Sequence, residues 1–175
     1  MTYRRDLWEI AATSNGVVTI AEAEDAGVPA VEVCKLAARN ALRAHGQGVY
    51  THRDLPHTAL TQPTVAVALA GAGAFRQREP VPHLAGWGDF NPPQVRVGTR
   101  RRVRRRLPGW LDLEKRGDIA DSDLTAYAGV PSTTVRRALE DMRRRMPPDR
   151  WRRLVAEAVH RELIDDGSAA RVGGT

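Results

Sequence analysis

Cysteine is almost absent from this chain. Cys34 is the single cysteine among 175 residues, which excludes an internal disulfide framework and suits a reducing cytoplasm. Because it falls inside an expected helix, we interpret Cys34 as a small packing residue and not as a reactive thiol. The fold must therefore be stabilised without covalent cross-links.

Long hydrophobic runs are also missing. The longest apolar stretch, residues 64–74, is about half as long as the roughly 20 residues that a membrane-spanning helix needs. Met1 is followed by charge, whereas a secretory signal would continue with an apolar run. We expect a soluble cytoplasmic protein with no membrane partner, associated with the nucleoid if it binds DNA.

No pattern of catalytic or metal-binding side chains is recognisable. His45, His52 and His57 do not have the spacing of common zinc sites, and no second cysteine completes a set of four ligands. Five carboxylates could bind metal in a nucleic-acid-processing enzyme, but no Asp…Glu-x-Lys or histidine-nucleophile arrangement accompanies them. They are Asp112, Glu114, Asp118, Asp121 and Asp123. We therefore expect no enzyme activity, no catalytic residue, no metal and no cofactor.

Basic residues exceed acidic ones. The chain has 27 Lys and Arg against 21 Asp and Glu, a net charge of +6 at pH 7 and a pI near 10.4. Such a balance predicts attraction to nucleic acid or to another acidic surface. A dense run of arginines consists of Arg100, Arg101, Arg102, Arg104, Arg105 and Arg106. This run is either a solvated, mobile loop or a clamp that faces phosphates or an acidic protein.

Residues 17–50 carry the most informative local pattern. Thr19 and Glu22 have the spacing of a capping box, so a helix begins there, and Gly27 is a typical helix end. Pro29 fits the first turn of a second helix because its missing N–H costs nothing there. The pattern predicts two helices joined by a tight turn.

The elements around these helices extend the pattern. Residues 3–14 have apolar side chains at helical spacing, and residues 42–50 resemble two short strands around a glycine turn. A helix, a tight turn, a basic helix and a hairpin in this order are typical of a winged helix-turn-helix domain. The DNA-binding candidates are Arg4, Arg5, Lys35, Arg39, Arg43, His45 and Gln47. The alternative is that Lys35 and Arg39 belong to a solvated helix face and that the exposed arginines have no role.

The remainder of the chain predicts a second domain. The polar, proline-containing residues 51–63 mark a boundary near residue 55. We expect a buried helix at about 59–75, a loop at 80–93, and strands at 94–97 and 110–114. A helix capped by Ser132, Thr133 or Thr134 should run to about residue 145, and a last helix should span about 149–164. Both have apolar residues at the spacing of a buried helix face. The predicted organisation is a winged helix-turn-helix at 1–55, a mixed α/β domain at 56–166 and a disordered tail at 167–175. The fold class is thus mainly α with small β (α+β).

Two stretches resemble the AbiEi family of antitoxins from bacterial type IV toxin–antitoxin systems. Residues 3–50 are similar to the winged N-terminal domain of that family, and Gly46-Gln47-Gly48-Val49-Tyr50 resembles its wing. Residues 128–142, which begin Ala-Gly-Val-Pro-Ser-Thr-Thr, are similar to a helix start in the C-terminal part of such proteins. Together they cover a little over a third of the chain. The arginine run is denser than the family pattern, and Pro29 stands where a serine is common.

The resemblance implies a function for each part. The N-terminal domain would bind inverted repeats in double-stranded operator DNA and repress its own operon. The C-terminal domain would counteract a nucleotidyltransferase-like toxin encoded beside it, with the arginine run facing that toxin or nucleic acid. A ligand-responsive winged-helix regulator is the alternative, and a nucleic-acid-processing enzyme is a weaker one.

Overall fold

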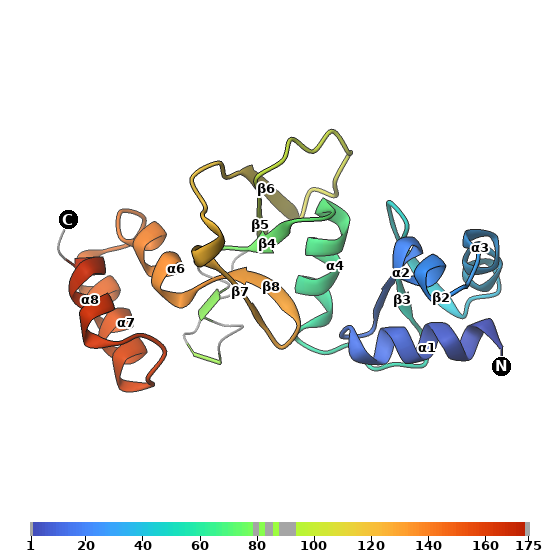
Figure 1. Ribbon diagram of the computed structural model, residues 1–175, viewed down its shortest axis with the longest axis horizontal. Helices are drawn as coiled ribbons and strands as arrows, with labels where there is room; N and C mark the ends of the chain where they lie inside the picture. Colours follow the sequence, from blue (N-terminus) through green and yellow to red (C-terminus); the bar gives the residue numbers. More distant parts are fainter. Residues whose placement is uncertain (1, 79–80, 83–85, 88–93, 174–175) are drawn as a thin grey trace. The chain divides into compact units, whose positions relative to one another are not determined.

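The computed structural model of the chain describes residues 2–78, 81–82, 86–87 and 94–173 (Figure 1). They form two compact units. The N-terminal unit consists of Met1–Ala74 and Val103–Pro108, and the C-terminal unit consists of Phe75–Arg102 and Gly109–Thr175. Helices and two separate sheets occur together, which confirms the predicted α+β class.

The N-terminal unit contains a three-stranded antiparallel sheet in the order β1-β3-β2. Its elements are α1 (Tyr3–Thr13), β1 (Val17–Thr19), α2 (Ile20–Asp25), α3 (Ala30–Ala38), β2 (Leu42–Gly46), β3 (Val49–His52) and α4 (Thr61–Ala70). The helices and the hairpin that we expected between residues 3 and 50 are therefore present.

Local signals explain the start and end of α2. The amide of Glu22 donates to Thr19 Oγ1 at 3.2 Å, and the amide of Thr19 donates to Glu22 Oε2 at 2.8 Å, which confirms the capping box. Gly27 follows α2 with a φ of +81°, a conformation that glycine adopts readily. Pro29 has a φ of −63° and directly precedes the first residue of α3.

The core of the N-terminal unit lies between its helices and its sheet. It is built from Leu7, Ala11, Val18, Ala23, Val28, Val33, Leu42 and Tyr50, all buried. Burial of apolar side chains is the dominant favourable term in folding, so these residues hold α1, α2 and α3 on the sheet. Leu36 and Ala37 of α3 are partly buried against the same core.

Helix α4 belongs to the N-terminal unit, so the boundary between the units lies later in the chain than we predicted. It packs on β1, β2 and β3, and Asn15 links to it through a hydrogen bond from Nδ2 to Thr64 Oγ1 at 3.1 Å. Thr61 Oγ1 donates in turn to the carbonyl of Asn15 at 2.9 Å. The structure thus places the division after Ala74 and not near residue 55. The polar stretch at residues 51–63 is a connection inside the unit, because the apolar face of α4 needs the sheet to cover it.

The C-terminal unit contains a mixed five-stranded sheet in the order β6-β5-β4-β8-β7. Its elements are β4 (Ala74–Arg76), β5 (Val95–Thr99), β6 (Leu111–Lys115), the 3₁₀ turn η1 (Asp121–Asp123), β7 (Leu124–Tyr127), β8 (Val130–Thr133), α6 (Val135–Met142), α7 (Pro148–His160) and α8 (Asp166–Gly173). The pairs β5–β6 and β4–β8 are parallel, and β7–β8 is antiparallel. Most of the loop expected at residues 80–93 lies outside the described residues.

A hairpin strand leads directly into α6. We expected Ser132, Thr133 or Thr134 to cap the start of this helix, and Thr134 does so. Ser132 and Thr133 belong to β8, where Ser132 pairs with Arg76 of β4. Ala128 and Gly129 both have positive φ angles, as a tight two-residue hairpin turn requires. Helix α6 begins one residue after Thr134, whose Oγ1 accepts from the amide of Arg137 at 3.3 Å.

Most of the predicted disordered tail is helical, and residues 174–175 lie outside the described residues. We expected residues 167–175 to be disordered, but Asp166–Gly173 form α8, and Val172 is buried in the core of the C-terminal unit. That core also contains Val135, Leu139, Met142, Trp151, Leu154 and Ala158, which confirms the predicted apolar stripes of α6 and α7. One buried valine is sufficient to give α8 an apolar surface to pack on, a signal too small to read from the sequence.

Candidate functional site

Helix α3 presents its predicted polar face to solvent. Lys35 and Arg39 are exposed, and Lys35 Nζ lies 2.7 Å from Glu32 Oε1. Val31 on the same helix is 57% exposed. Cys34 is exposed too, with Sγ 3.9 Å from Tyr50 Oη, so it is not the interior packing residue that we expected. This face combines two cations with small and apolar side chains.

The β2–β3 hairpin carries the other predicted contacts. Arg43 is exposed on β2, and Gln47 is exposed at the turn with a φ of +52°. His45 is half-buried, and its Nε2 lies 2.9 Å from Thr51 Oγ1. Burial, and to a lesser extent the charge of Arg43, lower the pKa of His45, so its ring is neutral at pH 7. Arg43 therefore supplies the positive charge of this hairpin, and His45 does not.

Arg4 and Arg5 of α1 have carboxylate partners. Arg4 Nη2 lies 2.6 Å from Asp54 Oδ2, and Arg5 Nε lies 3.2 Å from Glu9 Oε1. Both pairs are exposed to solvent. Exposed ion pairs contribute little to stability, so these arginines could exchange their carboxylates for phosphates at small cost.

The arginine run supplies the excess positive charge of the N-terminal unit. Residues 1–74 contain six Lys and Arg but seven Asp and Glu. Val103–Pro108 belongs to the same unit and adds three exposed arginines. A β-carbon on Gly71, at the end of α4, would lie 3.4 Å from Arg105 Nη1, so this guanidinium adjoins the helix end that favours cations. We expected all six arginines of the run to belong to the second domain, but the structure divides them between the two units.

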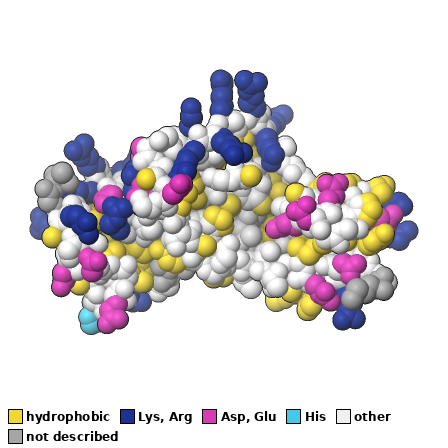
Figure 2. Space-filling model, viewed as in Figure 1, with side chains coloured by type: hydrophobic (Ala, Val, Ile, Leu, Met, Phe, Trp, Pro, Cys, Tyr) yellow, Lys and Arg dark blue, Asp and Glu magenta, His cyan; other side chains and the backbone are white. Residues whose placement is uncertain are grey.

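The first three arginines of the run belong to the C-terminal unit. Arg100 Nη1 lies 2.6 Å from Asp121 Oδ1, whereas Arg101 and Arg102 are exposed. Figure 2 shows basic side chains that project into solvent from the β5–β6 connection. The run is therefore a solvated connection whose two halves are assigned to different units.

The carboxylates that we considered for an enzyme are all paired with arginine. The pairs are Asp112–Arg96 at 3.6 Å, Glu114–Arg78, Asp118–Arg116 at 2.8 Å, Asp121–Arg100 at 2.6 Å and Asp123–Arg136 at 2.7 Å. A cation that already neutralises a carboxylate competes with a metal ion for it. Within the part of the chain that the structure describes, no group of three or more His, Cys, Asp or Glu could hold a metal.

A buried polar network surrounds Arg116, which sequence reasoning missed. Arg116 is 5% exposed and donates to Asp141 through Nη1 and Nη2 and to Asp118 through Nε and Nη2. These hydrogen bonds raise the pKa of Arg116 and lower the pKa of Asp118. Arg137 also pairs with both carboxylates. Arg116 and Asp141 are 25 residues apart in the sequence, so no local spacing signals their pairing.

Gln77 extends this network across the sheet. Its Oε1 accepts from Arg116 Nη1, and its Nε2 donates to Glu114 Oε2 at 3.1 Å. Glu114 is on β6, Gln77 follows β4, and β5 lies between them with Gly98 in register with Glu114. A β-carbon on Gly98 would lie 3.2 Å from Gln77 Oε1, so the missing side chain leaves room for Gln77 to cross β5.

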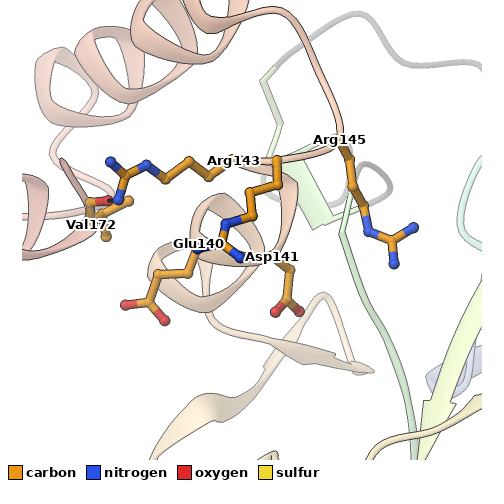
Figure 3. Close-up of a pocket in the computed structure, with 6 residues that line it drawn as sticks. Glu140, Asp141, Arg143, Arg145 and Val172 are labelled. Carbon is orange, nitrogen blue, oxygen red and sulfur yellow. Dashed lines mark hydrogen bonds between the residues drawn. The ribbon is translucent and has the colours of Figure 1, made fainter. Parts of the chain in front are cut away.

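A cavity of about 380 Å³ lies at the end of α6 (Figure 3). It is lined by Glu140, Asp141, Arg143, Arg144, Arg145 and Val172. The side chain of Arg143 extends toward Val172, where Nη1 donates to the backbone carbonyl at 3.4 Å. Pockets for apolar effector molecules are lined mainly by apolar side chains, whereas the lining of this cavity is mostly charged.

Comparison with models of known protein families gave no match, and no curated protein matched the chain significantly. Among the described helices, none has the length and apolar character needed to cross a membrane. The functional interpretation therefore depends on the residues themselves.

Proposed function

We propose that this protein is a DNA-binding autorepressor and antitoxin of a toxin–antitoxin operon, and that it is not an enzyme. The observation that carries the DNA-binding part is the exposed face of α3, with Lys35 and Arg39, next in the chain to a hairpin that exposes Arg43 and Gln47. The antitoxin part depends on the resemblance of residues 128–142 to the AbiEi family.

In this proposal α3 is the recognition helix of a winged helix-turn-helix and enters the major groove. Lys35 exchanges Glu32 for a phosphate or a base edge, and Arg39 lies at the end of the same helix. The β2–β3 hairpin is the wing, and Arg43 and Gln47 follow the backbone. Arg104, Arg105 and Arg106 strengthen the attraction to DNA, because residues 1–74 have no net positive charge of their own.

The C-terminal unit is proposed to counteract a nucleotidyltransferase-like toxin. The motif at residues 128–142 contributes β8 and α6, and α6 supplies Arg137 and Asp141 to the Arg116 network. That network holds α6 in place, and the exposed side chains of the Arg100–Arg102 segment are proposed to meet a partner. No catalytic role is assigned to the paired carboxylates.

Operator binding tests the DNA part. The full chain should bind a duplex with the inverted repeats upstream of its own gene, with an affinity that falls steeply as salt rises. Lys35→Ala and Arg39→Ala should each weaken operator binding by about 1–3 kcal/mol if these side chains reach base edges. Arg153→Ala, which removes an exposed arginine from α7, is the matched control and should have no effect. Equal affinity for the operator and for an unrelated duplex would contradict the proposal.

Two double variants test the division of the arginine run. Arg104→Ser with Arg105→Ser should weaken operator binding, because this segment belongs to the N-terminal unit. Arg101→Ser with Arg102→Ser should instead weaken the rescue of cells in which the neighbouring toxin is induced. A promoter reporter and growth under toxin induction measure the two effects. Identical behaviour of the two variants in both assays would argue against this assignment.

A further inference from the structure

A second, polar pocket lies in the C-terminal unit, at the carboxyl ends of two strands. Its volume is about 290 Å³, and its lining includes Arg78, two residues after β4, and Lys115, the last residue of β6. Arg145, which follows α6, completes its cationic side. In sheets with parallel strands, ligands commonly bind outside the carboxyl ends of the strands. The position of this pocket therefore suits a ligand.

Arg78 has a donor that nothing in the described structure satisfies. The residue is 5% exposed, and its Nη2 pairs with Glu114, but its Nε has no hydrogen-bond partner among the described residues. Its backbone φ is +63°, an uncommon conformation for a residue with a β-carbon. A buried guanidinium with an unpaired donor is costly, and an acceptor supplied by a ligand would remove that cost.

A second buried arginine, Arg76, lies two residues before Arg78, at the end of β4. Arg76 is 4% exposed, and its Nε and Nη1 have no partner within the described part of the chain. Burial lowers the pKa of Arg76 to about 10, so it still carries its charge at neutral pH. Its charge adds to the positive potential at the end of β4, where the low local dielectric weakens screening.

The carboxylates of the pocket are already neutralised. Glu114 accepts from Arg78 and Gln77, and Asp118 and Asp141 are both held by Arg116 and Arg137. Lys115 and Arg145 are exposed, and neither side chain has a hydrogen-bond or ion-pair partner among the residues that the structure describes. The pocket thus has unpaired positive charge beside an unpaired buried donor.

We propose that this pocket binds the phosphate group of a small phosphorylated ligand. Arg78 donates from the buried wall, and Lys115 and Arg145 neutralise the anion from the exposed side. Arginine matches phosphate geometry, and charge-assisted hydrogen bonds of this kind are strong. A volume of about 290 Å³ is at the lower end of the range for small-molecule sites, so the ligand is of nucleotide size or smaller. This site goes beyond the proposed function, because neither operator binding nor toxin neutralisation requires it.

The test is calorimetric titration of the full chain with inorganic diphosphate, in a buffer of low ionic strength without phosphate. Lys115→Gln and Arg145→Gln should each lower the affinity at least about fivefold, because each removes a charge-assisted contact. Arg153→Gln removes the same charge from an exposed position on α7 and should leave the affinity unchanged. Absence of saturable binding, or an equal loss in Arg153→Gln, would overturn the proposal.

Arg78 requires two variants because it is buried. Arg78→Gln should abolish binding, and circular dichroism must show that the variant is folded. Arg78→Lys keeps the charge but removes the Nε donor, and it should lose affinity while it retains the fold. Diphosphate binding to Arg78→Lys that equals binding to the unmodified chain would contradict the assigned role.

Further ligands identify the source of the phosphate. A nucleoside 5′-diphosphate should bind at least as tightly as inorganic diphosphate, and the nucleoside alone should not bind. A trinucleotide with a 5′-phosphate should bind more weakly than the nucleoside diphosphate. Tighter binding of the trinucleotide would contradict a small ligand and indicate that the pocket binds the phosphorylated end of a nucleic acid. Equal binding of the trinucleotide with and without its 5′-phosphate would exclude a phosphate-specific site.

Discussion

Arg116 and Asp141 form a bidentate ion pair, in which Nη1 donates to Oδ2 at 2.8 Å and Nη2 donates to Oδ1 at 3.0 Å. The side chains are 6% and 12% exposed, so water screens the pair weakly. Arg116 directly follows β6 and Asp141 lies near the end of α6. The pair therefore fixes the sheet of the C-terminal unit to a helix from a distant part of the sequence.

Removal of the Asp141 charge should destabilise the C-terminal unit. Asp141→Asn leaves the buried Arg116 with Asp118 as its remaining carboxylate, and loss of one partner of a buried pair costs about 3 kcal/mol. Denaturant unfolding measures the change in the free energy of unfolding. Asp149→Asn is the control, because Asp149 pairs with Arg152 on the surface and should cost less than about 0.5 kcal/mol. Equal stability of the two variants would contradict the structural role of the pair.

Gly98 should not tolerate a side chain. A β-carbon there would lie 2.5 Å from Cε2 of Phe75, a ring that is fully buried and has little space to move. Gly98→Ala should therefore lower the free energy of unfolding by about 1–3 kcal/mol, as overpacking does. Gly109→Ala is the matched control, because no atom of the described residues, apart from its chain neighbours, lies within 4 Å of a β-carbon at Gly109. If the two variants have the same midpoint of thermal unfolding, β4 and β5 do not approach each other as closely at this position as the structure indicates.

The stability of the C-terminal unit should depend on pH through Asp118. The hydrogen bond from Arg116 lowers the pKa of Asp118 below its usual value near 3.8, with a further contribution from Arg137. The contribution of this carboxylate is fully present above about pH 4 and is lost as pH falls through the lower pKa of the folded state. Because Asp118 is 56% exposed, solvent reduces the size of the effect.

The measurement for Asp118 is the free energy of unfolding between pH 7 and pH 2.5. Asp118→Asn should lose less stability than the unmodified chain on acidification, since it has no carboxylate to protonate at this position. Asp149→Asn controls for the general loss of surface charge. Parallel pH profiles for Asp118→Asn and the unmodified chain would show that Asp118 does not contribute.

The first 55 residues should not form a stable domain. A fragment of residues 1–55 lacks α4, whose buried Val65 and Leu69 belong to the N-terminal unit. A fragment of residues 1–76 retains this helix and should unfold cooperatively on heating, whereas residues 1–55 should not. Circular dichroism against temperature distinguishes them. A cooperative transition of equal midpoint in both fragments would restore the boundary that the sequence predicted.

Local chemistry explains which elements the sequence predicted well. The capping box of Thr19 and Glu22 and the glycine turn of the β2–β3 hairpin act between close neighbours, so their signals are complete within a few residues. The apolar stripes of α6 and α7 were equally readable because their period matches a helix. For these elements, the prediction and the structure agree.

Long-range pairing explains what the sequence did not predict. Strand β4 has three residues, and β8 contains Pro131, which disfavours a strand assignment. Their pairing and the Arg116 network depend on residues far apart in the chain, and no local pattern encodes such contacts. The arginine run was visible, but its division between two units was not. The DNA contacts of Lys35, Arg39, Arg43 and Gln47 stay a prediction.

The assignment of Val103–Pro108 to the N-terminal unit affects how the protein is made. A ribosome synthesises about 5–20 residues per second, so residue 108 leaves it roughly 2–7 s after residue 74. Small domains commonly fold within that interval. The N-terminal sheet and its helices therefore have time to fold on the nascent chain while they carry no excess of positive charge. The basic segment Val103–Pro108 is synthesised later. Until then, the N-terminal unit on the nascent chain has little electrostatic attraction for the ribosomal RNA around it.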